Sequence, residues 1–191
     1  DGEVPIDAHN TKIPVVYLEV FACPRDTKEH ESLVVSYAQP SHIHAALLLA
    51  GLQPGKPGEF DWTGPEMKAI APEGARVDVR FEYELKGEHK SVDPATWIVS
   101  ARTRKSLRET KPAAHFIFTG SREATNKGVT VYDADKSGTL IGLSTFSTET
   151  IAWSDMYNHD SGVEEPQWIA DSAHVPVLGT KLRVVITGVK K

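Results

Sequence analysis

The sequence contains a single cysteine, so no disulfide can form within the chain and no four-cysteine zinc or iron–sulfur site can be built from it alone. Long apolar runs are also missing. The longest apolar stretch extends from Ile43 to Leu52 and has about ten residues, interrupted by His44. A helix that crosses a bilayer needs roughly 20 apolar residues. We therefore expect no transmembrane segment.

Positive charge is scattered rather than gathered into a stripe. The chain has 21 basic and 26 acidic side chains, a net charge of −5 with neutral histidines. Nucleic-acid binding requires a basic surface that neutralises phosphates, so we expect no nucleic-acid partner. Gly-x-Ser-x-Gly, Walker, dinucleotide and His-Glu-x-x-His motifs do not occur, so hydrolase, nucleotide-binding and zinc-protease functions have no motif to support them.

The length of 191 residues and the 40% of hydrophobic residues suit one globular domain, which we place at residues 1–191. The first residues, Asp1 to Pro5, include neither an initiator methionine nor an apolar signal region. This start predicts a mature or trimmed end.

Several segments have the composition of strands. Val15–Phe21 and Ser32–Tyr37 are β-branched and aromatic, and we expect them to pair with each other. Arg76–Leu85 alternates apolar and charged residues, which predicts a strand with one buried face, and Lys181–Val189 predicts a final strand.

One segment, from Ser41 to Ala50, is the clearest helix. Ser41 suits an N-cap, strong helix formers follow, and Gly51 suits the left-handed residue after a helix. Because this helix is apolar nearly all round, we expect it to be buried. The fold class predicted is α+β: a single domain, mainly antiparallel β-sheet, with one well-defined buried helix (about Ser41 to Ala50) packed on it.

Two other segments allow more than one interpretation. Leu52–Gly74 is rich in proline and glycine, which predicts a loop held by Phe60 and Trp62, and this loop could offer a surface to a protein partner. The stretch from Arg102 to Lys111 is rich in basic residues and is either a solvated connection or an anion-binding patch.

Asp133–Gly138 resembles the start of a calcium loop. The position that needs a bidentate glutamate is Ser144, so a simple turn joining strands Val129–Tyr132 and Thr139–Ser144 is the favoured interpretation.

Reactive side chains concentrate between Cys23 and His44. Thiol, imidazole and carboxylate are ligands of zinc, copper and nickel, so a transition-metal or small-ligand site is one hypothesis. It would use the Lys28–Ser32 and Ser41–His44 motifs, with these candidate metal ligands: His30, His42, His44, Glu31 and Cys23.

Geometry limits this hypothesis. In a helix capped by Ser41, His42 and His44 lie about 200° apart around the axis and cannot bind one ion. The alternative is structural: one histidine faces the helix N-terminus and the other bonds a loop carbonyl or a carboxylate. A third interpretation is an enzyme, metal-dependent or with Cys23 as nucleophile and His30, His42 or His44 as base.

Several of these segments resemble those of a known protein family. The chain resembles the YdjY-domain family of bacterial proteins at Phe21–Pro24, Thr27–Ser32, Pro40–Gly51, Gly138–Phe146 and Pro176–Leu182. The resemblance implies an exported protein of the periplasm or cell envelope and supplies no catalytic residues. An iron–sulfur cluster does not fit, because Cys23 is alone. We therefore expect an exported binding or structural module with a protein or small-ligand partner; the alternative is the enzyme that uses the same cluster.

Overall fold

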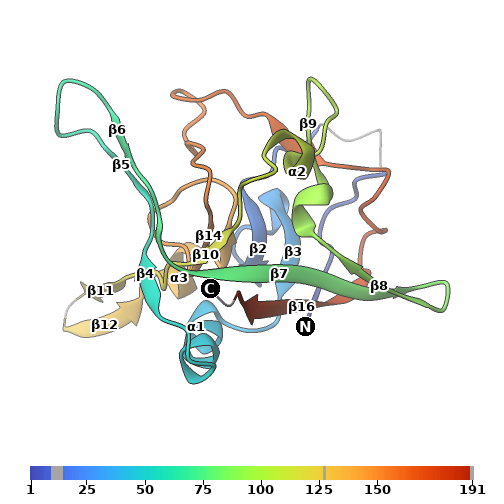
Figure 1. The fold of residues 1–191 in the computed structure, drawn as a ribbon, viewed down its shortest axis with the longest axis horizontal. Helices are drawn as coiled ribbons and strands as arrows, with labels where there is room; N and C mark the ends of the chain where they lie inside the picture. The colour runs from blue at the N-terminus through green and yellow to red at the C-terminus, as the bar shows by residue number, and fades with distance from the viewer. Residues whose placement is uncertain (10–14, 127, 190–191) are drawn as a thin grey trace.

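Strands dominate the fold, and they pair into a sheet that closes on itself (Figure 1). The structure is a computed structural model that describes residues 1–9, 15–126 and 128–189. Within these ranges eight strands form the ring, in the order β10 (Phe116–Phe118), β14 (Ile151–Trp153), β13 (Ile141–Gly142), β2 (Val20–Pro24), β3 (Ser32–Ser36), β1 (Gly2–Glu3), β16 (Lys181–Gly188) and β7 (Glu73–Leu85). Pairing of β10 with β7 closes the ring.

Neighbouring strands of the ring run antiparallel, except that β2 is parallel to β3 and β13 is parallel to β14. Hairpins and short strand pairs extend from the ring: β4 (Pro54–Lys56) and β8 (Glu88–Val92) on β7, β5 (Glu59–Asp61) with β6 (Lys68–Ile70), β11 (Glu123–Asn126) with β12 (Val129–Tyr132), and β9 (Ile98–Ser100) with β15 (Trp168–Ala170). The helices are α1 (Pro40–Leu49), α2 (Leu107–Thr110) and α3 (Asp133–Ser137), with 3-10 turns at Glu29–Glu31 and Pro94–Thr96.

The longest strand of the ring, β7, makes closure possible. Its alternation places Val77, Val79, Phe81 and Tyr83 in the core, as the sequence predicts, whereas Leu85 is exposed. Residues 77–82 pair with β16, while residues 75–77 pair with β10. Because β7 has partners on both edges, it joins the two ends of what would otherwise be an open sheet.

The predicted fold class is therefore wrong: the sheet is a closed ring and carries no buried helix among the described residues. A closed sheet fills its inner face with its own side chains, which leaves no broad apolar face for a helix. Within α1 only Pro40 and Leu47 are buried, and Leu49 is 90% exposed. The all-round apolar pattern of this helix indicated burial, but it did not identify a face that could be buried.

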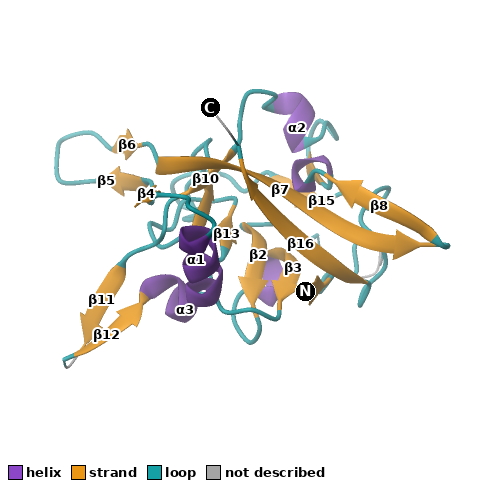
Figure 2. Ribbon diagram, turned by 60° about the horizontal axis from the view of Figure 1, so that its bottom comes forward, coloured by secondary structure: helices purple, strands orange, loops and turns teal. Residues whose placement is uncertain are grey.

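The ends of α1 show which parts of its prediction were right. Gln39, not Ser41, is the N-cap residue, and Pro40 occupies the first turn, where its missing N–H costs nothing. Gly51 has a φ of +83°, Gly51 N donates to Leu48 O, and Leu52 N donates to Leu47 O. This is the expected glycine C-cap in a Schellman motif. Beside α1 lies α3, whose Asp135 Oδ1 accepts from Ser41 N at 2.8 Å (Figure 2).

One predicted strand pairing is confirmed and another is wrong. The first two strands do pair, as β2 and β3, in parallel and through a crossover at residues 25–31, but β2 shares only its first two residues with the predicted strand Val15–Phe21. The strand at Val129–Tyr132, in contrast, pairs with β11 rather than with Thr139–Ser144. Asp133–Ser137 forms α3 instead of a hairpin turn, and Gly138 ends it at a φ of +77°.

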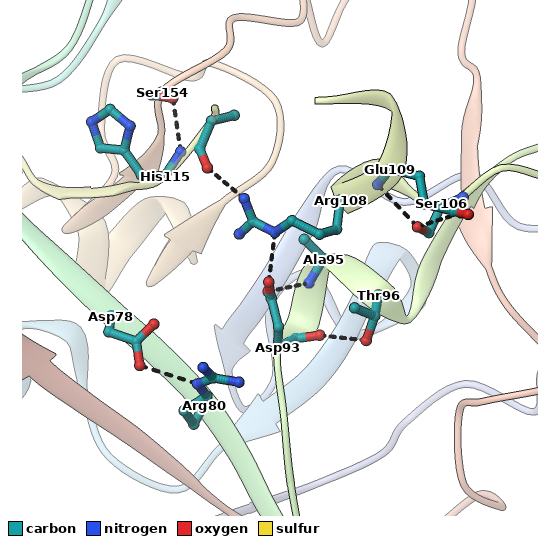
Figure 3. A network of polar contacts seen from close by, with 11 residues as sticks. Asp78, Arg80, Asp93, Ala95, Thr96, Ser106, Arg108, Glu109, His115 and Ser154 are labelled. Atoms are coloured by element: carbon teal, nitrogen blue, oxygen red, sulfur yellow. Dashed lines mark hydrogen bonds and ion pairs between the residues drawn. The ribbon is translucent and has the colours of Figure 1, made fainter. Parts of the chain in front are cut away.

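The basic stretch lies against carboxylates. Arg108 Nε donates to Asp93 Oδ2 and Arg108 Nη1 to the Ala114 carbonyl, both at 2.6 Å (Figure 3). The nitrogens of Arg104 and Lys111 lie 3.7 and 2.8 Å from Asp171 and Asp155 carboxylate oxygens, respectively. These three pairings favour the solvated connection over an anion-binding patch. Among the described residues, no helix has the length and apolar character needed to cross a bilayer.

Candidate functional site

The crossover between β2 and β3 places the reactive residues of the first sequence motif. Residues 25–31 return the chain over the outer face of β2 and cover Cys23, which is fully buried with Val20 and Val35 in a small cluster separate from the main core. Burial raises the pKa of the Cys23 thiol, an effect opposed by hydrogen bonds from Ser32 and Thr27. A buried thiol of raised pKa is a poor nucleophile and a poor metal ligand.

His30 and Glu31 lie at the end of this crossover. The His30 side chain is exposed, and its Nε2 is 3.7 Å from Glu31 Oε2. Glu31 Oε1 accepts from Lys28 Nζ at 2.6 Å. The two histidines of the second motif lie beyond the other end of β3, whose five residues span roughly 15 Å.

The α1 histidines have different surroundings. His42 is exposed, whereas His44 Nδ1 lies 2.9 Å from Tyr132 Oη and 3.1 Å from Gly120 O. A carbonyl can only accept, so Nδ1 carries the proton and His44 joins α1 to the ends of β10 and β12. Burial raises the pKa of Tyr132 to about 12, which keeps its hydroxyl neutral and able to donate.

The structure thus divides the five predicted metal ligands into two groups. Across the described residues, no three His, Cys, Asp or Glu side chains converge as metal ligands do. A transition-metal site at His30, His42, His44, Glu31 or Cys23 stays a prediction, and His44 in particular has the structural role that the alternative interpretation expected.

A second group of side chains surrounds Phe146; we call it the Phe146 cluster, and its members are Glu19, Lys28, Glu31, Phe146 and His159. The sequence indicated Lys28 and Glu31, but not Glu19, Phe146 or His159. Lys28 Nζ lies 4.0 Å from the centre of the Phe146 ring, and the His159 ring stacks on it at 4.8 Å. Burial, and then the nearby charge of Glu31, raises the pKa of Glu19. The lone acid in the apolar segment Val15–Phe21 was the only available signal.

A buried carboxylate holds the loop that carries Phe146. Glu149 is 1% exposed, and its Oε1 accepts from Phe146 N. Burial raises the pKa of Glu149, and neighbouring backbone N–H groups partly offset that effect. Glu149 therefore fixes the turn at residues 145–149, in which Ser147 has a φ of +63°.

Beside this cluster runs a hollow surface that we call the loop groove. A cleft of about 290 Å³ lies under the β5–β6 hairpin, a hollow of about 610 Å³ lies near Tyr17, and a narrow hollow of about 20 Å³ joins them. Adjacent hollows share wall residues, so we describe the three together as one groove: Asn158 and His159 are shared on one side, and Tyr17 with Glu164–Gln167 on the other.

Trp62 borders this groove, and its position shows that the predicted role of Trp62 in holding a loop is wrong. Phe60 and Trp62 line the cleft of about 290 Å³, but the Trp62 side chain is 58% exposed and does not pin a loop to the core. Leu52–Gly74 instead forms β4 and the β5–β6 hairpin, which extends from the body (Figure 1).

A larger hollow, about 780 Å³, lies at the start of β16 near Tyr37. Lys181 Nζ there contacts Glu3 and donates to Tyr37 Oη at 2.5 Å, and Arg25 lies over the Tyr37 ring. Two of the charged residues around this hollow are paired, Lys181 with Glu3 and His89 with Glu84. The groove walls instead include a buried polar atom, Trp168 Nε1, that has no hydrogen-bond partner among the described residues. We take the loop groove as the candidate site.

Comparison with known proteins identifies the family. The family model described as the YdjY domain matches residues 3–187. Curated proteins and solved structures gave no match. Because the match covers almost the whole chain, the resemblance at the five sequence segments is confirmed, and the protein belongs to the YdjY domain family.

Proposed function

We propose that this YdjY domain is a non-catalytic binding module and that its ligand lies in the loop groove. The observation that carries the proposal is the floor of the groove, where Trp168 lines the narrow hollow and its buried Nε1 has no hydrogen-bond partner among the described residues. Buried polar atoms are nearly always hydrogen-bonded, so such atoms suit contact with a ligand or an ordered water.

The scaffold supports the same proposal. Binding residues commonly lie on loops that a rigid sheet positions. Here the strand ring is the rigid part, and the groove walls come from loops near residues 144–147 and 157–167 together with the β5–β6 hairpin. The larger hollows fall near or within the range of roughly 300–1,000 Å³ typical of ligand pockets. We further infer that residues 1–191 act as one YdjY-like domain.

The enzyme alternative has weaker support. Cys23 is buried with a raised pKa, so it lacks the exposed, low-pKa environment of nucleophilic thiols. A bound metal remains testable: His30 and Glu31 offer two neighbouring ligands, too few for tight binding. Elemental analysis of untagged protein tests it: stoichiometric zinc, copper or nickel would support a metal site, and the absence of bound metal would contradict one.

Plugging the groove tests the binding proposal. Val163 lines the cleft and is 45% exposed, so Val163→Trp should fill it without disturbing the core. Val177→Trp is the matched control, because Val177 is equally apolar and 65% exposed outside the groove walls. In a fragment screen by NMR, we expect hits that shift groove amides in wild type and Val177→Trp but not in Val163→Trp. Fragments that still shift groove amides in Val163→Trp, or a screen in which no fragment shifts groove amides, would refute the proposal.

Export from the cytoplasm is the other part of the proposal, and it rests on the family resemblance. Fractionation of cells that express the full natural gene tests it. Protein found only in the cytoplasmic fraction would contradict export.

A further inference from the structure

The β5–β6 hairpin presents one tryptophan to solvent. Trp62 is 58% exposed, whereas Trp97, Trp153 and Trp168 are each at most 4% exposed. Phe60 lies beside Trp62 on the same wall of the cleft of about 290 Å³. A large aromatic surface left uncovered on a projecting hairpin is typical of a binding site.

The facing wall is polar and mostly uncharged. It consists of Thr145, Ser147, Asn158, His159 and Asp160, with the apolar Val163 beside them. His159 Nδ1 donates to Thr145 O at 3.1 Å, so in the neutral ring Nε2 is an acceptor. Asn158 Oδ1 accepts from Asp160 N at 2.9 Å, which leaves the Asn158 amide nitrogen as a donor.

We propose that the cleft binds a sugar ring of a neutral oligosaccharide. A pyranose ring has an apolar face of C–H groups, which packs on an aromatic ring, and a rim of hydroxyl groups, which each donate and accept hydrogen bonds. The cleft offers both: aromatic rings on the hairpin side, and hydroxyl, amide and imidazole groups on the opposite side. This inference rests on the proposed function and specifies its ligand class.

Charge favours a neutral sugar over a cationic ligand in this cleft. Asp160 is its one carboxylate among the described lining residues, and Asp160 Oδ1 already accepts from Gly162 N at 2.8 Å. The hydroxyl groups of Thr145 and Ser147 and the amide of Asn158 are neutral. A cationic peptide would need several unpaired carboxylates here.

The groove beyond the cleft adds a second aromatic platform. Tyr17 is 42% exposed and lines both the narrow hollow and the hollow of about 610 Å³. Ser100 and Gln167 supply further hydrogen-bonding groups there, beside the charged residues Arg102, Glu164 and Glu165. The narrow hollow is too small to hold a sugar ring. An oligosaccharide long enough to lie across it would reach from Trp62 to Tyr17, and its affinity should rise with chain length.

Tryptophan fluorescence and calorimetry test the proposal with defined probes: the hexasaccharides of glucose in α-1,4 and β-1,4 linkage, of xylose and of N-acetylglucosamine, their disaccharides, and hexalysine. We expect at least one hexasaccharide to shield Trp62 from acrylamide, because the other tryptophans are buried. Trp62→Ala should weaken its affinity about tenfold or more, and Tyr17→Ala should weaken hexasaccharide but not disaccharide binding.

Met67→Ala is the matched control, since Met67 is 42% exposed on the same hairpin segment but does not line the cleft. The affinity of Met67→Ala for the bound hexasaccharide should stay within about twofold of the wild-type affinity. Failure of every saccharide to bind, or binding that Trp62→Ala leaves unchanged, overturns the sugar inference. If fragments or hexalysine still bind and Val163→Trp blocks them, the proposed binding function survives that failure; if nothing binds the groove, both fail.

Discussion

Cys23 illustrates how a residue that looks reactive in sequence becomes inert in the fold. The crossover at residues 25–31 buries the thiol and raises its pKa. We predict that the native protein reacts with a disulfide reagent at pH 8 at least about 100-fold more slowly than a free thiol, whose pKa is about 8.5. Unfolding in guanidinium should release one equivalent of fast-reacting thiol, and rapid labelling of native protein would contradict burial.

Glu149 should make stability depend on pH. Its folded-state pKa is raised by burial, so the native state holds this proton more tightly than the unfolded chain does. The unfolding free energy should therefore fall as pH rises above the ordinary carboxyl range of about 4.3. Glu149→Gln keeps an oxygen that accepts from Phe146 N but cannot ionise, so denaturant titrations from about pH 5 to pH 8 should show a smaller fall.

Glu19 also has a raised pKa and will leave part of this dependence in the variant. Superimposable pH profiles for wild type and Glu149→Gln would show that Glu149 does not couple protonation to folding.

At the scale of residues, the sequence drew attention to the Cys23–His44 region but did not show which of its side chains lie together. Glu31 and His30 do lie side by side, since they are adjacent in the chain. Glu19, Phe146 and His159 meet them only through pairing of distant segments, which no local pattern records. Trp62 offered a misleading signal, because an aromatic residue in a loop usually packs against the core.

At the scale of elements, α1 packs on the core through Leu47 and Ile43 and makes side-chain hydrogen-bond contacts with the ends of β10 and β12 through His44. His44 contacts Tyr132 and Gly120, and its ring lies 5.1 Å from the Phe118 ring. We predict that His44→Ala lowers the unfolding free energy by about 1–3 kcal/mol, because it leaves the Tyr132 and Gly120 oxygens with fewer partners.

His42→Ala provides the control, since His42 occupies the same helix and is exposed. It should change stability by less than about 0.5 kcal/mol in the same chemical denaturation assay. Equal effects of the two substitutions would remove the anchoring role assigned to His44.

Local patterns predicted elements better than their surroundings. Strict alternation located β7 and its buried face, because period-two sequences determine which side chains share a side of a strand. Helix formers and Gly51 located α1 within one residue. Neither pattern shows which other element packs against the strand or the helix. The exposure of α1 and the pairing of β7 along both of its edges could therefore not be predicted.

For the molecule as a whole, closure makes the strands interdependent. Phe118 is fully buried in β10 and its backbone pairs with both β14 and β7, so it lies at the seam of the ring. We predict that Phe118→Ala costs about 3–5 kcal/mol and that thermal unfolding remains a single transition by both fluorescence and circular dichroism.

Val177→Ala, at a 65% exposed position, should leave the transition midpoint within about 1–2 °C of wild type. Separate transitions for the two probes would argue that the seam opens independently and that residues 1–191 are not one cooperative unit.

The position of β16 determines when the ring of strands can close during synthesis. This strand lies between β1 and β7, and its first residues, Lys181 and Leu182, pair with Glu3 and Gly2 near the start of the sequence. A ribosome must therefore release nearly the entire domain before the ring can close. Until then the free edges of β1 and β7 are exposed to other chains, so the growing polypeptide would benefit from a holding chaperone.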